Sequence, residues 1–500
     1  LIASLPGPLA NAADLSDIPS TVAKQIRRHE ISPADVSLYV HAVAEPRPRL
    51  AFNAEIPRNP ASTIKLLTTE AALDMLGPGY VWKTKAFIDG TLRDGRLDGN
   101  LFLKGYGDPN ISPEDFWRFL WGIRERGVET VGGDVILDNS YFEPPAAKRG
   151  DFDGAANRAY NALPSALSIN RQTTRIHMVQ VGSGAEIRVF TDPPLANIDV
   201  QNRIKLVQAP CKSKYHKPAL RVVEDGGQAT LKLSGTFASK CGEASYPRLL
   251  LDPAAHAGNS FAALWREMGG RVEGVVREGT RSKAARLLHT MDSPPLEEVV
   301  RAINKRSDNL MSRTLFLTLG AKRIGAPGSL PKARQAVTDW LNARGLEIPG
   351  LVMDNGSGLS RNARISAEGM GRLLGYAYAS PTMPELLSSL SIAGVDGTMR
   401  KRFKKGALAG RAHIKTGTIK GATGIAGYVL DKAGRRWIVV SLINNPRLQT
   451  WRGKAVENAL LQWVYEEAGA TPGGQARAAS QAPTEPAPEA WFLQEKKVGG

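Results

Sequence analysis

The chain has 500 residues, of which 42% are hydrophobic and 7% aromatic, so it is long enough for roughly three globular domains with real cores. Its formal net charge of +17 predicts attraction to polyanions such as an anionic wall polymer or membrane surface. The basic residues form no long Lys/Arg block, which favours a solvated basic surface over a nucleic-acid site. The seven histidines show no metal-binding spacing, so we expect neither a catalytic metal nor a cofactor.

The first dozen residues are typical of the end of a secretory signal. Leu1–Leu5 is largely apolar and leads to Ala10-Asn11-Ala12, an A-x-A-type cleavage site, so residues 1–12 are predicted to be a residual signal peptide. No other run approaches the length of a membrane span. We therefore expect an exported, periplasmic protein, a compartment in which Cys211 and Cys241 can form a disulfide.

Residues 13–80 are predicted to be the first part of a catalytic domain. Residues 15–30 have the pattern of a short amphipathic helix, and residues 37–43 and 50–53 that of a strand hairpin. A helix with a buried apolar stripe is then expected from Thr63 onward.

The start of that helix carries the chemistry. Ser62 and Lys65 are three positions apart and share a helix face, as a nucleophile and its base would. Considered alone, Ser62 is equally well explained as a helix N-cap. The spacing is also common by chance: Ser329-Leu330-Pro331-Lys332 matches it in a predicted loop.

Three further segments follow. Residues 81–292 consist of short β-type runs with Gly and Asn between them, which predicts inserted domains with a nested β-rich domain at about 165–252. Residues 293–470 return to helices and end in three strands and an amphipathic helix, as the second part of the catalytic domain would. Residues 471–500 are rich in Pro, Ala, Gln and Gly, which predicts a disordered tail.

Three motifs occur in a fixed order along the chain. They are Ser62-Thr63-Ile64-Lys65, Ser307-Asp308-Asn309 and Lys415-Thr416-Gly417-Thr418, matching the S-x-x-K, S-D-N and K-T-G set of penicillin-binding proteins and class A β-lactamases. A second S-x-N at Ser168-Ile169-Asn170 is less well placed between helices. Ser307-Asp308-Asn309 alone could be a helix cap and Lys415 a surface lysine, but all three motifs in order are highly specific.

Each residue type has a chemical reason. Ser62 would attack a carbonyl, and Lys65 would accept its proton if neighbouring cations lower its pKa. Ser307 would relay the proton to the leaving nitrogen, and Asn309 would bind a peptide substrate. Lys415 and a hydroxyl of Thr416 or Thr418, on the strand that includes Gly417, would bind a carboxylate. The backbone N–H groups of Thr418 and Ser62 would form an oxyanion hole.

The similarity extends beyond these motifs. Over about residues 15–468 the chain resembles the D-alanyl-D-alanine carboxypeptidase/endopeptidase family, the class C low-molecular-mass penicillin-binding proteins. The further matching segments are Asn59–Thr69, Lys104–Pro109, Gly133–Val135, Gly356–Arg361 and Asp396–Thr398. The chain departs from the pattern at Tyr106, where a glycine is expected, and at Asn170, where some relatives have an acidic residue that senses the diamino acid of the stem peptide.

The resemblance implies an α+β fold: a penicillin-recognising serine acyl-transferase domain, with a five-stranded antiparallel sheet flanked by helices and with inserted β-rich domains. The strand pattern agrees, because two strands precede Ser62 and three follow residue 410. The two cysteines would then lie in the nested domain.

The implied function is a periplasmic serine D-Ala-D-Ala carboxypeptidase or endopeptidase that acts on peptidoglycan stem peptides and cross-links. β-Lactam antibiotics would acylate Ser62. The alternatives are a β-lactamase of the same fold, which the large insertion argues against, and a non-catalytic basic wall-binding protein. The sequence leaves the balance between carboxypeptidase and endopeptidase activity open.

Overall fold

The computed structural model describes residues 14–469 except 144–145, 183, 185, 212–217 and 226–227. The predicted signal peptide (1–12) and the predicted tail (471–500) lie outside the described residues. Within the described part of the chain, no helix is long and apolar enough to cross a membrane.

The catalytic domain is built on a six-stranded antiparallel sheet. Its order is β2 (Leu50–Phe52), β1 (Val36–Ala42), β24 (Arg436–Asn444), β23 (Ala422–Leu430), β22 (Ala412–Ile419) and β21 (Ser391–Ile392). The α+β fold class is confirmed, and the sixth strand, which the sequence pattern did not predict, has only two residues. Because β21 pairs only with His413 and Ile414, the rest of β22 is a free sheet edge.

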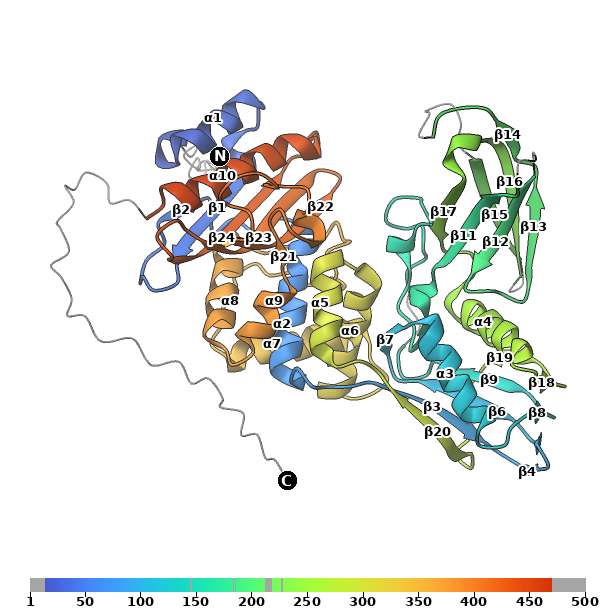
Figure 1. Ribbon diagram of the computed structural model, residues 1–500. Coiled ribbons are helices and arrows are strands. Elements are labelled where there is room, and N and C mark those ends of the chain that lie inside the picture. The colour runs from blue at the N-terminus through green and yellow to red at the C-terminus, as the bar shows by residue number, and fades with distance from the viewer. Residues whose placement is uncertain are drawn as a thin grey trace, which may run out of the picture.

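Helices cover both faces of this sheet (Figure 1). On one side lie α1 (Ser20–Arg28) and α10 (Thr450–Glu466), and on the other α2 (Lys65–Leu76), α5 (Leu296–Arg306), α6 (Asn309–Arg323), α7 (Leu330–Ala343), α8 (Ala367–Ala379) and α9 (Met383–Ser389). Successive residues of β24 belong to the two cores, since Val439 packs with the α1/α10 side and Val440 with the other. The sheet is therefore buried on both faces, and only its edge is available to a substrate.

Helix α2 is the central helix of the domain. The sequence predicted one buried stripe, but all nine residues from Lys65 to Leu73 are buried. The chain also enters the helix differently from the prediction: residues Ala61–Ile64 form a 3-10 turn, and the α-helix begins at Lys65. The first residue of this turn, Ala61, has a φ of 46°, in the left-handed region.

The insertion leaves and re-enters the catalytic domain through one pair of strands. Its first strand, β3 (Lys83–Ile88), pairs with its last, β20 (Arg286–Asp292), so the two crossings lie side by side (Figure 1). The larger sheet adds β6 (Leu101–Gly105), β9 (Val135–Asp138) and β19 (Val276–Glu278); a smaller sheet contains β4 (Thr91–Arg93), β5 (Arg96–Asp98), β8 (Thr130–Val131) and β18 (Arg271–Val272). The helices are α3 (Pro113–Arg124) and α4 (Pro253–Glu267), and β7 (Asp108–Ile111) pairs with β10 (Leu167–Ile169).

A β-rich unit with its own core lies between β10 and α4. One sheet consists of β11 (Thr174–Gln180), β12 (Ile187–Asp192) and β17 (Glu243–Arg248); the other of β13 (Ile198–Asn202), β14 (Lys205–Val207), β15 (Pro218–Asp225) and β16 (Gln228–Ala238). Cys211 and Cys241 form a disulfide within this unit. We propose residues 81–292 and about 165–252 as the limits of the inserted and nested domains.

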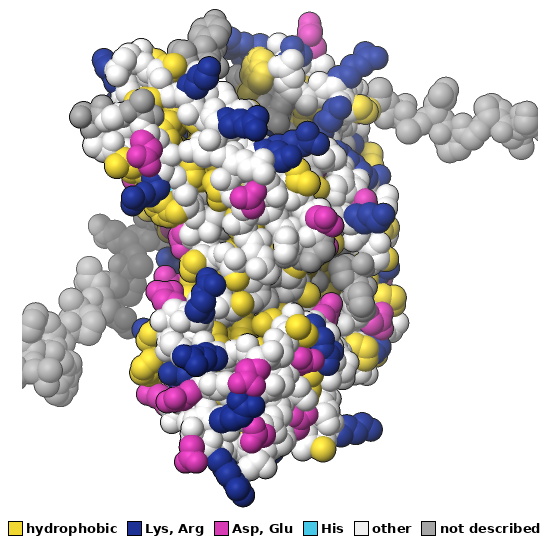
Figure 2. All heavy atoms as spheres, turned by 90° about the vertical axis from the view of Figure 1, so that its right-hand side faces the viewer, with side chains coloured by type: hydrophobic (Ala, Val, Ile, Leu, Met, Phe, Trp, Pro, Cys, Tyr) yellow, Lys and Arg dark blue, Asp and Glu magenta, His cyan; other side chains and the backbone are white. Residues whose placement is uncertain are grey.

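The face of the molecule that includes the insertion has no block of a single charge. Figure 2 shows Lys and Arg side chains interspersed with Asp and Glu side chains over this face. On this face, basic and acidic side chains are therefore mixed; the solvated basic surface stays a prediction for the rest of the molecule.

Glu70, on the central helix, provides a test of the fold. Both of its carboxyl oxygens are buried without a hydrogen-bond partner in the described structure, and burial, with a contribution from Asp74, raises its pKa to about 8. The folded state therefore retains this proton while the unfolded state, with a pKa near 4.5, releases it. We expect the free energy of unfolding to decrease as the pH rises from 4.5 to 8, by at most about 5 kcal/mol from this group.

Urea unfolding at several pH values measures this dependence. The isosteric Glu70→Gln variant should lose most of the slope, whereas Glu55→Gln, at an exposed glutamate, should retain it. An unchanged slope in Glu70→Gln would contradict the assignment of a protonated, buried Glu70.

Candidate functional site

The turn that presents Ser62 is fixed by two asparagines. The Asn59 N–H donates to Oδ1 of Asn444 on β24 at 2.6 Å, and Asn444 Nδ2 donates back to the Asn59 carbonyl at 3.0 Å. Asn59 Oδ1 accepts from the Ala61 N–H at 2.9 Å. The N-cap positions of the 3-10 turn and of α2 are Pro60 and Ile64, so Ser62 is not a helix cap.

Lys65 lies beneath Ser62 with its amine completely buried. Its Nζ is 3.0 Å from Oγ of Ser62, donates to Oδ1 of Asn309 at 2.7 Å and also donates to the carbonyl oxygen of Ser357. Two of these partners are pure acceptors, while the third is a hydroxyl that can donate. A neutral amine, with two N–H groups and one lone pair, satisfies this environment when the lone pair faces Ser62.

The electrostatic surroundings favour that neutral amine. Burial holds the pKa of Lys65 well below its ordinary value, and the charges of Lys415 and Arg313 lower it further, against the opposing effect of Asp308. A general base needs a pKa close to the working pH. The contact with Ser62 and the lowered pKa of Lys65 are both what its predicted role as a general base requires.

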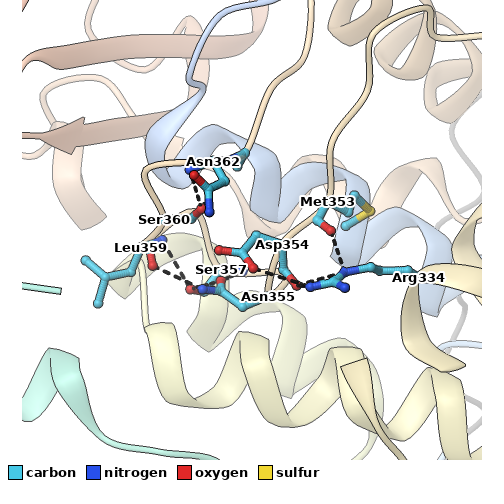
Figure 3. Close-up of polar contacts among 9 residues, drawn as sticks. Arg334, Met353, Asp354, Asn355, Ser357, Leu359, Ser360 and Asn362 are labelled. Carbon is cyan, nitrogen blue, oxygen red and sulfur yellow. Dashed lines mark hydrogen bonds and ion pairs between the residues drawn. The ribbon is translucent and has the colours of Figure 1, made fainter. Parts of the chain in front are cut away.

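The Ser357 carbonyl that accepts from Lys65 belongs to a loop before α8. Figure 3 shows the polar contacts within this loop. Asn355 Oδ1 accepts from the Ser357 N–H at 3.1 Å and from its Oγ at 2.8 Å, and Asn355 Nδ2 donates to the Leu359 carbonyl at 3.0 Å. Arg334 on α7 holds the base of the loop by donating to the Asp354 carbonyl at 2.9 Å. The sequence identified this loop by its glycines, but not its contact with Lys65.

The Ser307-Asp308-Asn309 segment joins α5 to α6. Ser307 follows the last residue of α5 in the left-handed conformation, with φ 56°, and Asp308 caps α6 by accepting from the Met311 N–H at 3.0 Å. Both polar atoms of the Asn309 side-chain amide form hydrogen bonds within the protein. Nδ2 donates to the Tyr160 carbonyl at 3.1 Å, and Oδ1 accepts from Lys65. Its role toward a peptide substrate stays a prediction; its contact with Lys65 is what the structure adds.

Lys415, on the free edge of β22, has a completely buried side chain. Its Nζ donates to Oγ of Ser307 at 2.9 Å and to the Thr416 carbonyl at 2.8 Å. Burial lowers its pKa to about 7. The interpretation of Lys415 as an ordinary surface lysine is therefore excluded by its burial, and a carboxylate brought into the cavity would stabilise its charge.

The insertion contributes residues to the site that the motifs did not reveal. Arg171 donates to the Asp308 carboxylate at 3.2 Å, and Arg313 on α6 donates to the Ala162 carbonyl at 3.0 Å. With the Tyr160 carbonyl, these contacts place residues 160–171 against the start of α6. Asn170 is one of the two positions at which the chain departs from the family pattern. Its side chain donates to the Thr173 carbonyl within its own turn.

The predicted site residues come together around one cavity of about 470 Å³. Ser62, Ser307, Thr416, Gly417 and Thr418 line it, together with Gly397, Thr398, Arg400, Lys401, Arg402, Gly424, Lys454 and Glu457. Lys65, Asn309 and Lys415 lie behind this lining and connect to it through hydrogen bonds. In the described part of the chain, no cluster of three or more His, Cys, Asp or Glu residues could hold a metal ion.

The chain is similar to known D-alanyl-D-alanine carboxypeptidases. The model of the D-Ala-D-Ala carboxypeptidase 3 (S13) family matches residues 19–467. The D-alanyl-D-alanine carboxypeptidase of Actinomadura sp. (strain R39) is 29% identical over 403 residues, which are 77% of this chain and 73% of that protein. The DacB D-alanyl-D-alanine carboxypeptidase of Haemophilus influenzae is 25% identical over 412 residues, 81% of this chain and 85% of that protein.

A solved structure shows the same fold. The crystal structure of penicillin binding protein 4 (dacB) from Haemophilus influenzae has a TM-score of 0.74 and 23% identity, and the match covers 89% of this chain and 99% of that chain. The match includes the insertion as well as the catalytic domain, because its coverage exceeds what the catalytic domain alone would give.

Gly417 provides a test of the site geometry. A Cβ atom added there would meet the Pro60 carbonyl oxygen at 2.7 Å and the Ser62 nitrogen at 2.8 Å, so β22 passes this close to the Ser62 turn only as glycine. We expect Gly417→Ala to push the strand from the turn and to lower the rate of Ser62 acylation by a labelled penicillin about a hundredfold, because displacing a reacting group by about 1 Å has such an effect.

The matched control is Gly79→Ala, since an added Cβ at Gly79 meets nothing within 4 Å. That variant should be acylated at the rate of the parent. Equal rates for Gly417→Ala and the parent would show that β22 does not help to form the reactive geometry.

Proposed function

Because the chain belongs to the D-Ala-D-Ala carboxypeptidase 3 (S13) family and is a DD-carboxypeptidase that acts on peptidoglycan, we propose that it works through an acyl-enzyme on Ser62. The observation that carries the proposal is the contact between Lys65 Nζ and Ser62 Oγ at 3.0 Å, made by an amine whose other two partners are acceptors. A nucleophile and a buried base in hydrogen-bond reach are the minimum set for covalent catalysis.

The first half of the reaction uses two proton paths. Ser62 Oγ attacks the carbonyl carbon of the D-Ala-D-Ala bond and passes its proton to Lys65, while the backbone N–H groups of Ser62 and Thr418 would bind the oxyanion. Ser307 gives its proton to the departing nitrogen and takes one from Lys415, whose Nζ already donates to its oxygen. The C–N bond breaks, D-alanine leaves, and an ester on Ser62 remains.

The second half regenerates the enzyme. Lys65, now protonated, returns its proton to the Lys415 and Ser307 pair through solvent, and as a neutral amine it accepts a proton from the water that attacks the ester. As the ester C–O bond breaks, Lys65 passes that proton to Ser62 Oγ, so Ser62 is restored as the alcohol and the shortened peptide leaves as the acid. A β-lactam would enter the same path, and we propose that it acylates Ser62; the Haemophilus influenzae protein has been solved in complex with a novel β-lactam.

The charge of the cavity supports recognition of a C-terminal carboxylate. Lys415 has no ion-pair partner in the described structure, and its low pKa would rise on binding an anion. Thr416 Oγ donates to Thr398 Oγ at 2.8 Å, and Thr418 is exposed at the mouth of the site. Stem peptides that end in D-Ala-D-Ala carry such a carboxylate at the leaving group.

One observation weighs against a β-lactamase. Of the described residues that line the cavity, Glu457 is the one carboxylate, and it is already bound by Arg402 at 3.0 Å and by Thr423 at 2.5 Å. It is not free to activate a water for rapid release of a penicilloyl group. We therefore expect slow deacylation. A non-catalytic wall-binding protein would not require the buried Lys65 amine.

We also propose export to the periplasm, where the substrate is found. The predicted cleavage site at Ala10-Asn11-Ala12 and the disulfide between Cys211 and Cys241 support it, because disulfides persist in oxidising compartments.

Labelled penicillin tests the nucleophile. The parent protein should gain one penicilloyl mass on the peptide that contains Ser62, and Ser62→Ala should gain none. The rate at which Ser62→Ala hydrolyses a D-Ala-D-Ala pentapeptide should fall by several orders of magnitude, since removing the nucleophile of a serine protease lowers kcat on the order of 10⁶-fold.

The second S-x-x-K match is the internal control. The predicted loop at Ser329–Lys332 is wrong, because Ser329 is the N-cap residue of α7 and Pro331 is tolerated in its first turn. Ser329→Ala should be labelled and should turn over substrate like the parent. Labelling of Ser62→Ala at the level of the parent would show that another residue is the nucleophile.

A further inference from the structure

The cavity beside Ser62 has a wall of positive charge that the proposed mechanism does not use. Beyond Thr398 it is lined by Arg400 and Lys401, and also by Lys454 of α10. All three side chains are exposed to the cavity or to solvent. Such a concentration of like charge in a cleft attracts anions beyond the single carboxylate that Lys415 can accept.

These cations have no carboxylate of their own. Arg402, the fourth cation of the lining, is paired with Glu457 at 3.0 Å and donates to Asn458 Oδ1 at 2.8 Å. Among the described residues, neither Arg400 nor Lys401 nor Lys454 forms an ion pair with Glu457 or with any other carboxylate. Lys454 interacts with Glu457 through its charge. The lining nevertheless has four cations, Arg400, Lys401, Arg402 and Lys454, against the single carboxylate of Glu457.

The segment that presents the wall is held in place. Lys305 of α5 forms an ion pair with Asp396 at 2.6 Å, and the same carboxylate accepts from the Ile392 N–H of β21 at 2.8 Å. Met399 is buried in the α1/α10 core, one residue before Arg400. The cations are thus mounted on an anchored turn and not on a free loop.

The wall lies on the leaving-group side of the proposed scissile bond. The cavity contains Ser307, which would protonate the leaving nitrogen, and Thr416, which contacts Thr398 next to the wall. Asn309 does not line this cavity; its amide contacts Tyr160 of the insertion. The two ends of a substrate would accordingly meet different parts of the chain.

The geometry points to a subsite that binds a leaving group with several carboxylates, namely the second stem peptide of a peptidoglycan cross-link. We propose that Arg400 and Lys401 form it, together with Lys454 of α10. The inference rests on the proposed function, because it places the leaving group beside Ser307. It implies a preference for cross-links over single pentapeptides, and hence endopeptidase activity.

The charge balance favours this occupant over D-alanine. D-alanine brings one carboxylate, which Lys415 and the hydroxyls of Thr416 and Thr418 can bind. Arg400 and Lys401 would then have no anion to neutralise. The leaving strand of a cross-link is a peptide with further free carboxylates, which can reach the wall while its amine departs from Ser62. Charge pairs at a partly exposed rim contribute mainly to selectivity and association, so the expected effect is a moderate change in preference.

The test compares two substrates on the full-length protein. The variant with both Arg400→Gln and Lys401→Gln should lose about tenfold in kcat/KM on a cross-linked muropeptide dimer and less than roughly twofold on a pentapeptide monomer. Raising the salt from about 0.05 to 0.5 M should reduce the dimer preference of the parent and leave that of the variant unchanged.

The matched control is Lys404→Gln, an exposed lysine of the same segment that does not line the cavity. It should behave like the parent on both substrates. Equal losses on dimer and monomer, no loss on either, or the same loss in Lys404→Gln would each overturn the subsite.

Two further measurements, penicillin acylation of the parent and calorimetric binding of the dimer, separate this inference from the proposed function. If the parent is not acylated by penicillin at Ser62, the proposed function fails. If acylation is normal and the two substrates are affected alike, only the subsite fails. In the Ser62→Ala background, the same two substitutions should weaken calorimetric binding of the uncleaved dimer about tenfold. Unchanged binding would contradict the subsite independently of turnover.

Discussion

The site depends on one constraint: a lysine amine is completely buried next to the nucleophile. A charged amine is costly to bury, so the fold has to supply either an anion or a neutral state. It supplies the second, because Asn309 and the Ser357 carbonyl satisfy two N–H groups and Ser62 faces the remaining position of Lys65. The three partners come from three separate segments, and only their simultaneous packing around α2 produces a base.

The same packing explains why glycine flanks the nucleophile on two sides. Gly417 approaches the turn from β22, and Gly358 approaches it from the loop before α8, where an added Cβ would meet the Ala61 carbonyl oxygen at 1.9 Å. Gly358 also has a φ of 77°, which other residues adopt only with strain. The Ser62 turn is thus enclosed between two backbones. Any side chain there would separate the elements that meet at Lys65.

The sequence predicted what is encoded locally. Strand-type runs bounded by turn residues located five of the six strands of the catalytic sheet, and the Ser62, Ser307 and Lys415 motifs located the elements of the site, because each spans only a few residues. Contacts that join distant segments were not predictable: the Ser357 carbonyl on Lys65 and the Tyr160 carbonyl on Asn309 have no local pattern. The basic run at residues 400–405 is visible in the sequence, but its place beside Ser62 is not. The all-round burial of α2 was missed for the same reason, since a helix surrounded by other helices leaves its polar residues inside as well.

The surroundings of the catalytic residues come from two parts of the chain. Residues of the insertion contact the start of α6: Arg171 binds Asp308, and the Tyr160 carbonyl accepts from Asn309. The cationic wall belongs instead to the catalytic domain, through the turn after Asp396 and through α10. If the substrate lies along the edge of β22, the insertion is placed to act on its acyl side and the wall on its leaving group. Substrate preference on either side of the bond could then change by substitution in one part of the chain, while the hydrogen bonds that position Lys65 remain intact.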